Sequence, residues 1–167
     1  LLKKACENFR AIAAPEQRQD FNQFCENKAY WLDDYALFMA IKEDKQGAGW
    51  NAWEPEVSKR NKEALEKCRL KLPGEIFLQK FLQYEFARQW ADLKHYANSK
   101  GIYIVGDIPI YVAHDSADVW ARPENFSLDV NTGEPAMMAG VPPDYFSATG
   151  QLWGNPIYNW GRLKKTN

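Results

Sequence analysis

The chain has 167 residues, of which 46% are hydrophobic and 26% charged, and its formal net charge is -1. This near-neutral balance argues against bulk electrostatic binding to nucleic acid or to an anionic membrane surface. No apolar run approaches the roughly 20 residues that span a bilayer, and the opening LLKKACENFR contains no signal-peptide hydrophobic stretch. Three widely spaced cysteines predict reduced thiols and a cytoplasmic location. With two histidines and no CxxC motif, we expect no metal site and no cofactor.

The first half of the chain is predicted to be helical. Apolar residues at helical spacing predict a helix over residues 1–14 and a second one that begins at Pro15 or Glu16. A third helix is expected over residues 35–43, with Asp33 as its candidate N-cap. Residues 47–55, GAGWNAWEP, have the composition of a loop with two tryptophans.

Two further helices follow that loop. Residues 58–70 predict a short charged helix, which Pro73 and Gly74 end. The longest helix is expected over residues 75–99, with Gly101 at its C-terminal cap. The sequence therefore predicts a helix-rich N-terminal two thirds.

The run 102–105, IYIV, is continuous in apolar residues, as is typical of a strand buried on both faces. A long helix, a tight turn and a buried strand make half of a βαβ repeat. Asp107 follows this predicted strand, and in parallel α/β folds the active-site groups lie just past the carboxyl ends of strands. The residues therefore favour an α/β fold.

Residues 106–160 form a long region with little regular periodicity and many aromatic and polar side chains. Aromatic rings can cover the apolar faces of a pyranose while carboxylates and amides bind its hydroxyls. A loop this long is usually functional or disordered, and this one is too aromatic for disorder. We predict a sugar site formed by Asp107, Tyr111, His114, Asp144, Tyr145, Phe146, Trp153 and Asn155.

Each candidate also has a structural explanation. Asp107 could cap local loop amides, and His114 could be structural rather than a proton carrier. Asp115, Ser116 and Asp118 fit the N-cap and first turn of a short helix that ends near Trp120 better than a site. The segment 140–155 places rings between glycine hinges, which favours a loop that closes on a ligand over a loop core.

Known catalytic signatures are missing from the sequence. It contains neither a phosphate-binding P-loop nor a GxSxG nucleophile elbow. A glycosidase needs two carboxyl groups, which retaining enzymes hold about 5 Å apart. Asp107 and Asp144 are the tempting pair, but no glutamate lies in a comparable context, so we assign no catalytic residue.

Three segments carry a resemblance to a known family: FCENKAYWLDDYALFMAIKE, GDIPIYVAHDSADVW and AGVPPDYFSATGQLWGNPIYNW. They resemble glycoside hydrolase family 77, the 4-α-glucanotransferases called amylomaltases or disproportionating enzymes. The similarity is colinear over residues 21–165, and the VPPDYFS and GQLWGNP blocks are its most specific parts.

The resemblance implies part of a (β/α)₈ TIM barrel of the α-amylase clan, with a long loop insertion after a barrel strand. Residues 1–167 would be a single partial catalytic-barrel segment, with 106–160 as its substrate-binding loop region. The implied reaction transfers α-1,4-glucan segments between maltooligosaccharides or glucose by retaining double displacement. These sugars would be its partners, without nucleic acid or membrane.

The resemblance also implies roles for single residues. Asp107 matches the family's first amylase-type motif at the bound glucose. Asp144, Tyr145 and Phe146 match the tip of a mobile loop over the groove. Trp153 and Asn155 match residues near the acceptor, whereas Trp31, Asp34 and Tyr35 match a block with mostly structural roles.

The sequence departs from the family pattern at the catalytic residues. The family's nucleophile lies in an Arg-x-Asp-His motif downstream of NPIYNW, followed by its acid/base glutamate, and neither motif is present here. The chain is therefore expected to be an internal fragment that is inactive alone. Two alternatives stay open: a non-catalytic α-glucan-binding fragment, and a structural or interaction remnant without a ligand.

Overall fold

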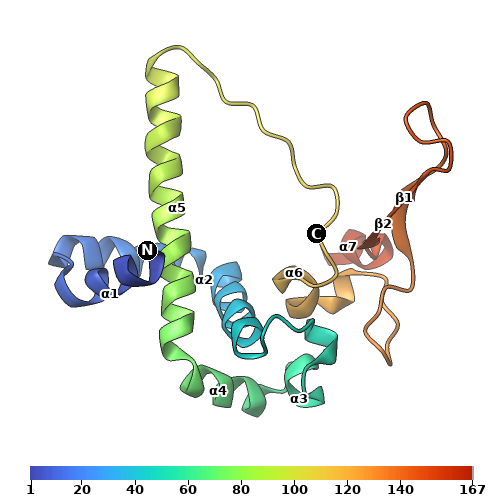
Figure 1. Ribbon diagram of the computed structural model, residues 1–167, viewed down its shortest axis with the longest axis horizontal. Helices are drawn as coiled ribbons and strands as arrows, with labels where there is room; N and C mark the ends of the chain where they lie inside the picture. Colours follow the sequence, from blue (N-terminus) through green and yellow to red (C-terminus); the bar gives the residue numbers. More distant parts are fainter. Residues whose placement is uncertain (167) are drawn as a thin grey trace. The chain divides into compact units, whose positions relative to one another are not determined.

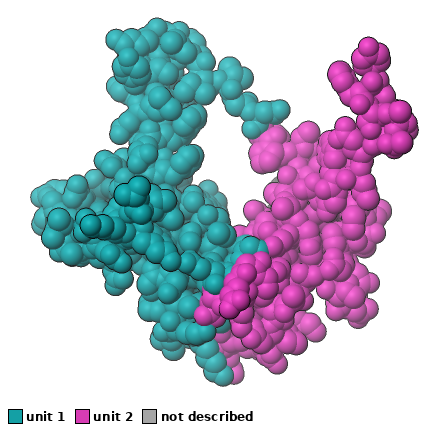
Figure 2. Space-filling model, in the orientation of Figure 1, with its two compact units in different colours: residues 1–43, 66–107 teal, residues 44–65, 108–167 magenta. Residues whose placement is uncertain are grey.

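The computed structural model describes residues 1–166; Asn167, the last residue of the predicted barrel segment, lies outside the described residues. The chain divides into two compact units (Figure 2). Unit 1 comprises Leu1–Glu43 and Glu66–Asp107, and unit 2 comprises Asp44–Leu65 and Ile108–Asn167. Each unit thus joins two stretches that are distant in the sequence.

Unit 1 contains the three long helices α1 (Leu2–Ile12), α2 (Pro15–Asp44) and α5 (Pro73–Ser99) (Figure 1). The ring of Phe21 lies 5.5 Å from that of Phe9, 5.1 Å from Phe77 and 5.6 Å from Tyr84. All three helices contribute to this aromatic core, whose buried centre consists of Cys6, Phe21, Phe81 and Tyr84.

One continuous helix, α2, replaces the second and third predicted helices, which were expected from Pro15 or Glu16 and over residues 35–43. Asp33 is therefore not an N-cap; it lies inside α2 and forms an ion pair with Lys80 of α5. The sequence from 16 to 44 contains neither proline nor glycine, so nothing in it interrupts the helical hydrogen bonds.

The predicted helix over 75–99 is confirmed as α5, and so is its glycine cap. Gly101 has a φ of +74°. Its N–H donates to the carbonyl of Asn98, and the N–H of Ile102 donates to that of Ala97, at 3.0 Å each. This is the Schellman arrangement, which favours glycine because a side chain is strained at positive φ.

The strand predicted over 102–105 is not formed; these residues are irregular and exposed, with Val105 91% accessible. A strand needs a neighbour for its backbone hydrogen bonds. Within residues 1–166 the two strands, β1 (Met138–Val141) and β2 (Gln151–Pro156), pair only with each other, in an antiparallel sheet. The chain combines helices with this one small sheet, and the barrel stays a prediction.

Unit 2 is built from short elements. The loop with two tryptophans contains the 3₁₀ helix η1 (Trp50–Ala52), followed by α3 (Pro55–Ser58). The charged helix predicted over 58–70 is α4 (Lys62–Lys71), which begins in unit 2 and ends in unit 1. Later in unit 2 come α6 (Ala117–Ala121), η2 (Pro123–Asn125) and α7 (Trp160–Thr166).

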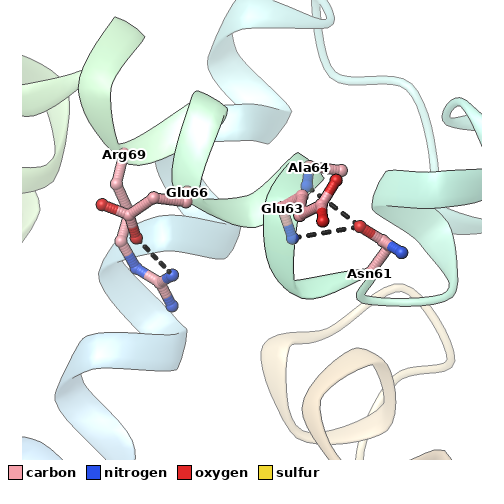
Figure 3. A network of polar contacts seen from close by, with 5 residues as sticks. All are labelled: Asn61, Glu63, Ala64, Glu66 and Arg69. Atoms are coloured by element: carbon pink, nitrogen blue, oxygen red, sulfur yellow. Dashed lines mark hydrogen bonds and ion pairs between the residues drawn. The ribbon is translucent and has the colours of Figure 1, made fainter.

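Two helix starts depend on side-chain caps. At α4, Oδ1 of Asn61 accepts hydrogen bonds from the backbone N–H groups of Glu63 at 3.0 Å and Ala64 at 3.2 Å (Figure 3). At α6, Oγ of Ser116 accepts from the N–H of Val119, which confirms the predicted capped helix. Each cap satisfies an N–H that has no partner inside the helix.

The hairpin of β1 and β2 projects from the rest of unit 2 (Figure 1, orange and red). Gly140 lies opposite Leu152, and a Cβ at Gly140 would come within 2.5 Å of the carbonyl oxygen of Gln151. The close approach of the two strands therefore requires glycine there. A register irregularity between Met138 and Gly140 bends the hairpin.

None of the helices in residues 1–166 is both long and apolar enough to cross a membrane.

We expect Phe21→Ala to destabilise unit 1 by about 3–5 kcal/mol, because it leaves a cavity among the rings of Phe9, Phe77 and Tyr84. Urea unfolding followed by helical circular dichroism measures the loss. Phe86→Ala is the matched control, since Phe86 lies on α5 with 66% of its surface exposed. Its effect should stay within about 0.5 kcal/mol, and equal losses in both variants would contradict the aromatic core.

Asn61→Ala should destabilise the start of α4 by about 1 kcal/mol, since two backbone N–H groups lose their acceptor. Asn61→Asp keeps an oxygen at the capping position and should retain the stability of the parent chain. Amide hydrogen exchange at Glu63 and Ala64 reports on the cap directly. Unchanged exchange in Asn61→Ala would show that solvent replaces the side chain without loss.

Candidate functional site

The hairpin ends in a turn over residues 142–150 that the side chain of Asp144 organises. Its Oδ1 accepts hydrogen bonds from the N–H groups of Phe146 at 2.9 Å and Ser147 at 2.8 Å. The carbonyl oxygen of Ser147 accepts from the N–H groups of Asp144 at 2.9 Å and Gly150 at 3.2 Å. This Asx-type turn fixes the backbone of the tip without a hydrophobic core.

Two aromatic rings extend from this turn into solvent. Tyr145 is 96% exposed and Phe146 is 90% exposed. Their ring centroids lie 5.6 Å apart at an interplanar angle of 90°. Exposed rings on a hydrogen-bonded turn form a rigid apolar surface, which suits a ligand that has its own apolar faces.

A row of rings continues from the base of the hairpin. Trp153 of β2 lies 6.3 Å from Tyr111, and Tyr111 stacks on Tyr158 at 6.1 Å. Tyr158 in turn lies 5.5 Å from Trp160. Burial raises the pKa of Tyr158 above its ordinary value, which lies well above neutral pH already. Trp153 keeps 45% of its surface exposed and can stack on a ligand.

His114 is half-buried and connects three segments of unit 2. Its Nε2 lies 2.7 Å from the carbonyl oxygen of Gly133, and its own carbonyl accepts a hydrogen bond from Trp50 Nε1 at 2.8 Å. Because a carbonyl oxygen only accepts, Nε2 carries the proton. These contacts support the structural explanation for His114; a role in sugar binding stays a prediction.

Asn155 and Asp107 occupy different surroundings. Asn155 is half-buried, and its Nδ2 donates to the carbonyl oxygen of Val112 at 2.9 Å, which ties β2 to the segment before α6. Asp107 is exposed and is the last residue of unit 1. Unit 2 therefore holds every predicted site residue except Asp107. Among the predicted site residues, the ring contacts are the pairs Tyr111–Trp153 and Tyr145–Phe146.

Sequence analysis did not identify a cavity of about 1130 Å³ in unit 2. None of the eight predicted site residues lines it; Trp50 and Trp53 do, together with residues of the segment 123–133 and of α7. The two tryptophans within GAGWNAWEP are each only 5% exposed, so they belong to the core of unit 2 and border the cavity from beneath its surface. Within residues 1–166, no group of three or more His, Cys, Asp and Glu side chains is arranged to hold a metal ion.

Comparisons with known proteins identify one family for the chain. The model of glycoside hydrolase family 77, described as 4-alpha-glucanotransferase, matches residues 1–167. A 4-alpha-glucanotransferase of Synechocystis sp. is 57% identical over 99% of this chain and 33% of its own length. One from Clostridium butyricum is 50% identical over 100% of this chain and 34% of its own length.

A solved structure agrees with these relatives. Amylomaltase from Streptococcus agalactiae in complex with acarbose matches with a TM-score of 0.91 and 44% identity, over 99% of this chain and 33% of that one. The chain thus spans about one third of the length of the relatives that it matches. Since the family model covers every residue and the identities are high, the chain belongs to the 4-alpha-glucanotransferases of glycoside hydrolase family 77.

Proposed function

We propose that this chain supplies part of the substrate site of a 4-α-glucanotransferase that acts on maltooligosaccharides, α-1,4-glucans and glucose. Such an enzyme would cleave one α-1,4 bond of a donor and pass the glucosyl segment to a hydroxyl of an acceptor. The proposed setting is starch, glycogen or maltose metabolism in the cytoplasm. One observation carries the proposal: the hairpin tip holds Tyr145 and Phe146 exposed on an ordered turn.

The chemistry of the tip fits an α-glucan. Pyranose rings present apolar C–H faces, which stack on aromatic rings, and hydroxyls, which need amides or carboxylates. Trp153 and Tyr111 offer a second ring surface at the base of the same hairpin. We infer that Tyr145, Phe146, Tyr111 and Trp153 contact the sugar directly, and that Asp107, His114 and Asn155 bind it or position the loops that do.

Asp144 is better explained as a positioning residue than as a sugar ligand. One of its carboxylate oxygens already accepts two backbone hydrogen bonds. These bonds hold the N–H groups on either side of the Phe146 side chain, so the carboxylate fixes the direction in which the ring points. Its loss would therefore weaken glucan binding indirectly.

The proposed mechanism is retaining double displacement. A carboxylate nucleophile attacks the anomeric carbon while an acid protonates the leaving oxygen, and the acceptor hydroxyl then displaces the enzyme. This chain contributes neither group in our proposal, because it lacks the Arg-x-Asp-His motif. Its role is to bind and orient the donor and acceptor.

We expect the 167-residue chain to bind maltoheptaose and the variant Phe146→Ala to bind it about tenfold more weakly, since an aromatic contact contributes on the order of 1.4 kcal/mol. Isothermal titration calorimetry gives both affinities. Phe86→Ala removes a ring of unit 1 that is 66% exposed and should bind as the parent does. Equal weakening in both variants would contradict a site at the hairpin tip.

Asp144→Ala should weaken binding of maltoheptaose severalfold, because the turn loses two hydrogen bonds to its backbone. Asp144→Asn retains an oxygen that can accept them and should bind nearly as the parent does. The same titration compares the two. If Asp144→Asn binds as weakly as Asp144→Ala, then the charge itself contacts the sugar, and the positioning role is wrong.

We expect no turnover of maltotriose by the 167-residue chain, because the motifs that carry the nucleophile and the acid/base are absent from it. Chromatography of the products after long incubation is the measurement. A complete 4-alpha-glucanotransferase such as the Synechocystis relative provides the positive control. Formation of glucose and longer oligosaccharides by the chain alone would contradict this prediction and would require a catalytic pair within it.

A further inference from the structure

We propose that Tyr158 is a positioning residue, which holds the ring of Tyr111 in the orientation that contacts the glucan. The inference rests on the proposed function, in which Tyr111 touches the sugar. Tyr158 follows β2 in the segment PIYNW and lies in unit 2, as Tyr111 does. No motif or spacing in the sequence singles it out.

The side chain of Tyr111 depends on ring contacts for its orientation. Residues 100–116, which include it, contain neither helix nor strand. Among residues 1–166, its ring contacts are those with Trp153 and Tyr158, and its hydroxyl has no hydrogen-bond partner. The hydrogen bond from Asn155 to the carbonyl of Val112 fixes the adjacent backbone but leaves the direction of the Tyr111 ring open.

The two ring contacts of Tyr111 differ in geometry. Its centroid lies 6.1 Å from that of Tyr158 at an interplanar angle of 19°, and 6.3 Å from that of Trp153 at 65°. Nearly parallel, offset rings stack face to face, whereas inclined rings meet at an edge. Tyr158 therefore constrains the plane of the Tyr111 ring. Tyr111 stays half-buried, so part of its ring remains available to a pyranose.

Tyr158 is itself anchored by its ring and by its backbone. Its ring lies 5.1 Å from that of Phe126, which is only 7% exposed. The two residues also form an antiparallel β-bridge, and the N–H of the next residue, Asn159, donates to the carbonyl oxygen of Asn125 at 2.8 Å. A fixed ring can thus orient a neighbour on an irregular segment, which lowers the entropy that the neighbour loses when a ligand binds.

The test measures maltoheptaose affinity of the 167-residue chain by titration calorimetry. Tyr158→Leu should bind about fivefold more weakly, because the stack on Tyr111 is lost. Tyr158→Phe keeps the ring and should bind as the parent does, since the hydroxyl has no hydrogen-bond partner in the described part of the chain. Tyr30→Leu is the matched control: it removes a tyrosine that is 71% exposed on α2 and should leave the affinity unchanged.

A double-mutant cycle separates positioning from a general loss of packing. If Tyr158 acts through Tyr111, then Tyr158→Leu should cause no further loss of affinity in a chain that already carries Tyr111→Ala. A structural role alone would weaken binding equally in both backgrounds. The fluorine signal of Trp53, labelled as 5-fluorotryptophan and buried in unit 2, reports whether each variant is folded. Tyr158→Met, which fills more of the volume, replaces Tyr158→Leu if that variant unfolds.

The outcomes distinguish this inference from the proposed function. Additive losses in the cycle, or full affinity in Tyr158→Leu, would overturn the positioning role while Tyr111→Ala still binds weakly. Weak binding by Tyr158→Phe would overturn it in another way, because the hydroxyl would then contact the sugar itself. Full affinity in both Tyr111→Ala and Phe146→Ala would instead contradict the proposed function, and the positioning role with it.

Discussion

The buried indole of Trp120 is the interaction on which unit 2 depends. Unit 2 joins Asp44–Leu65 with a stretch that begins more than forty residues later, at Ile108. Trp120, only 1% exposed, joins the two: its Nε1 donates to the carbonyl oxygen of Val57 at 3.2 Å, and its ring meets Trp53 at 5.7 Å. The guanidinium of Arg60 lies 4.3 Å from the same ring. The indole thus contacts both stretches of unit 2 through its ring and its N–H.

The proposed sugar surface at the hairpin depends on that anchor. Trp53 packs on Trp120 and is itself only 5% exposed, so it belongs to the buried centre of unit 2. Trp50 fixes His114 through its N–H, and His114 holds Gly133, which brings the loop 129–133 to the cavity. Asn155 joins the hairpin to the segment before α6 through Val112. The rigid centre of unit 2 therefore orients the exposed rings at its edge.

The sequence predicts local structure well where one residue decides it. Gly101 and Ser116 cap their helices as their residue types favour, and helical periodicity predicts α5.

Prediction from the sequence fails where the structure depends on distant residues. Asp33 has the chemistry of an N-cap, but its ion pair with Lys80 and the absence of a helix breaker keep α2 continuous. The apolar run 102–105 has the composition of a strand. A strand forms only when a second segment pairs with it, and the composition of the run does not show whether that segment is present. The proposed site shows the same limit: motifs predict Tyr145 and Phe146, whereas the cavity arises from three segments that no motif connects.

The exposure of the rings at the hairpin tip is the reason for which we propose a binding role for them. Tyr145 and Phe146 bury almost none of their surface, so they contribute little to the stability of unit 2. Exposed aromatic rings also favour association between molecules. The tip nevertheless keeps its shape through hydrogen bonds of Asp144 and Ser147 alone, which need no apolar core. A turn stabilised by polar groups leaves both rings available, and an apolar ligand face that covers them recovers the hydrophobic free energy that folding does not use.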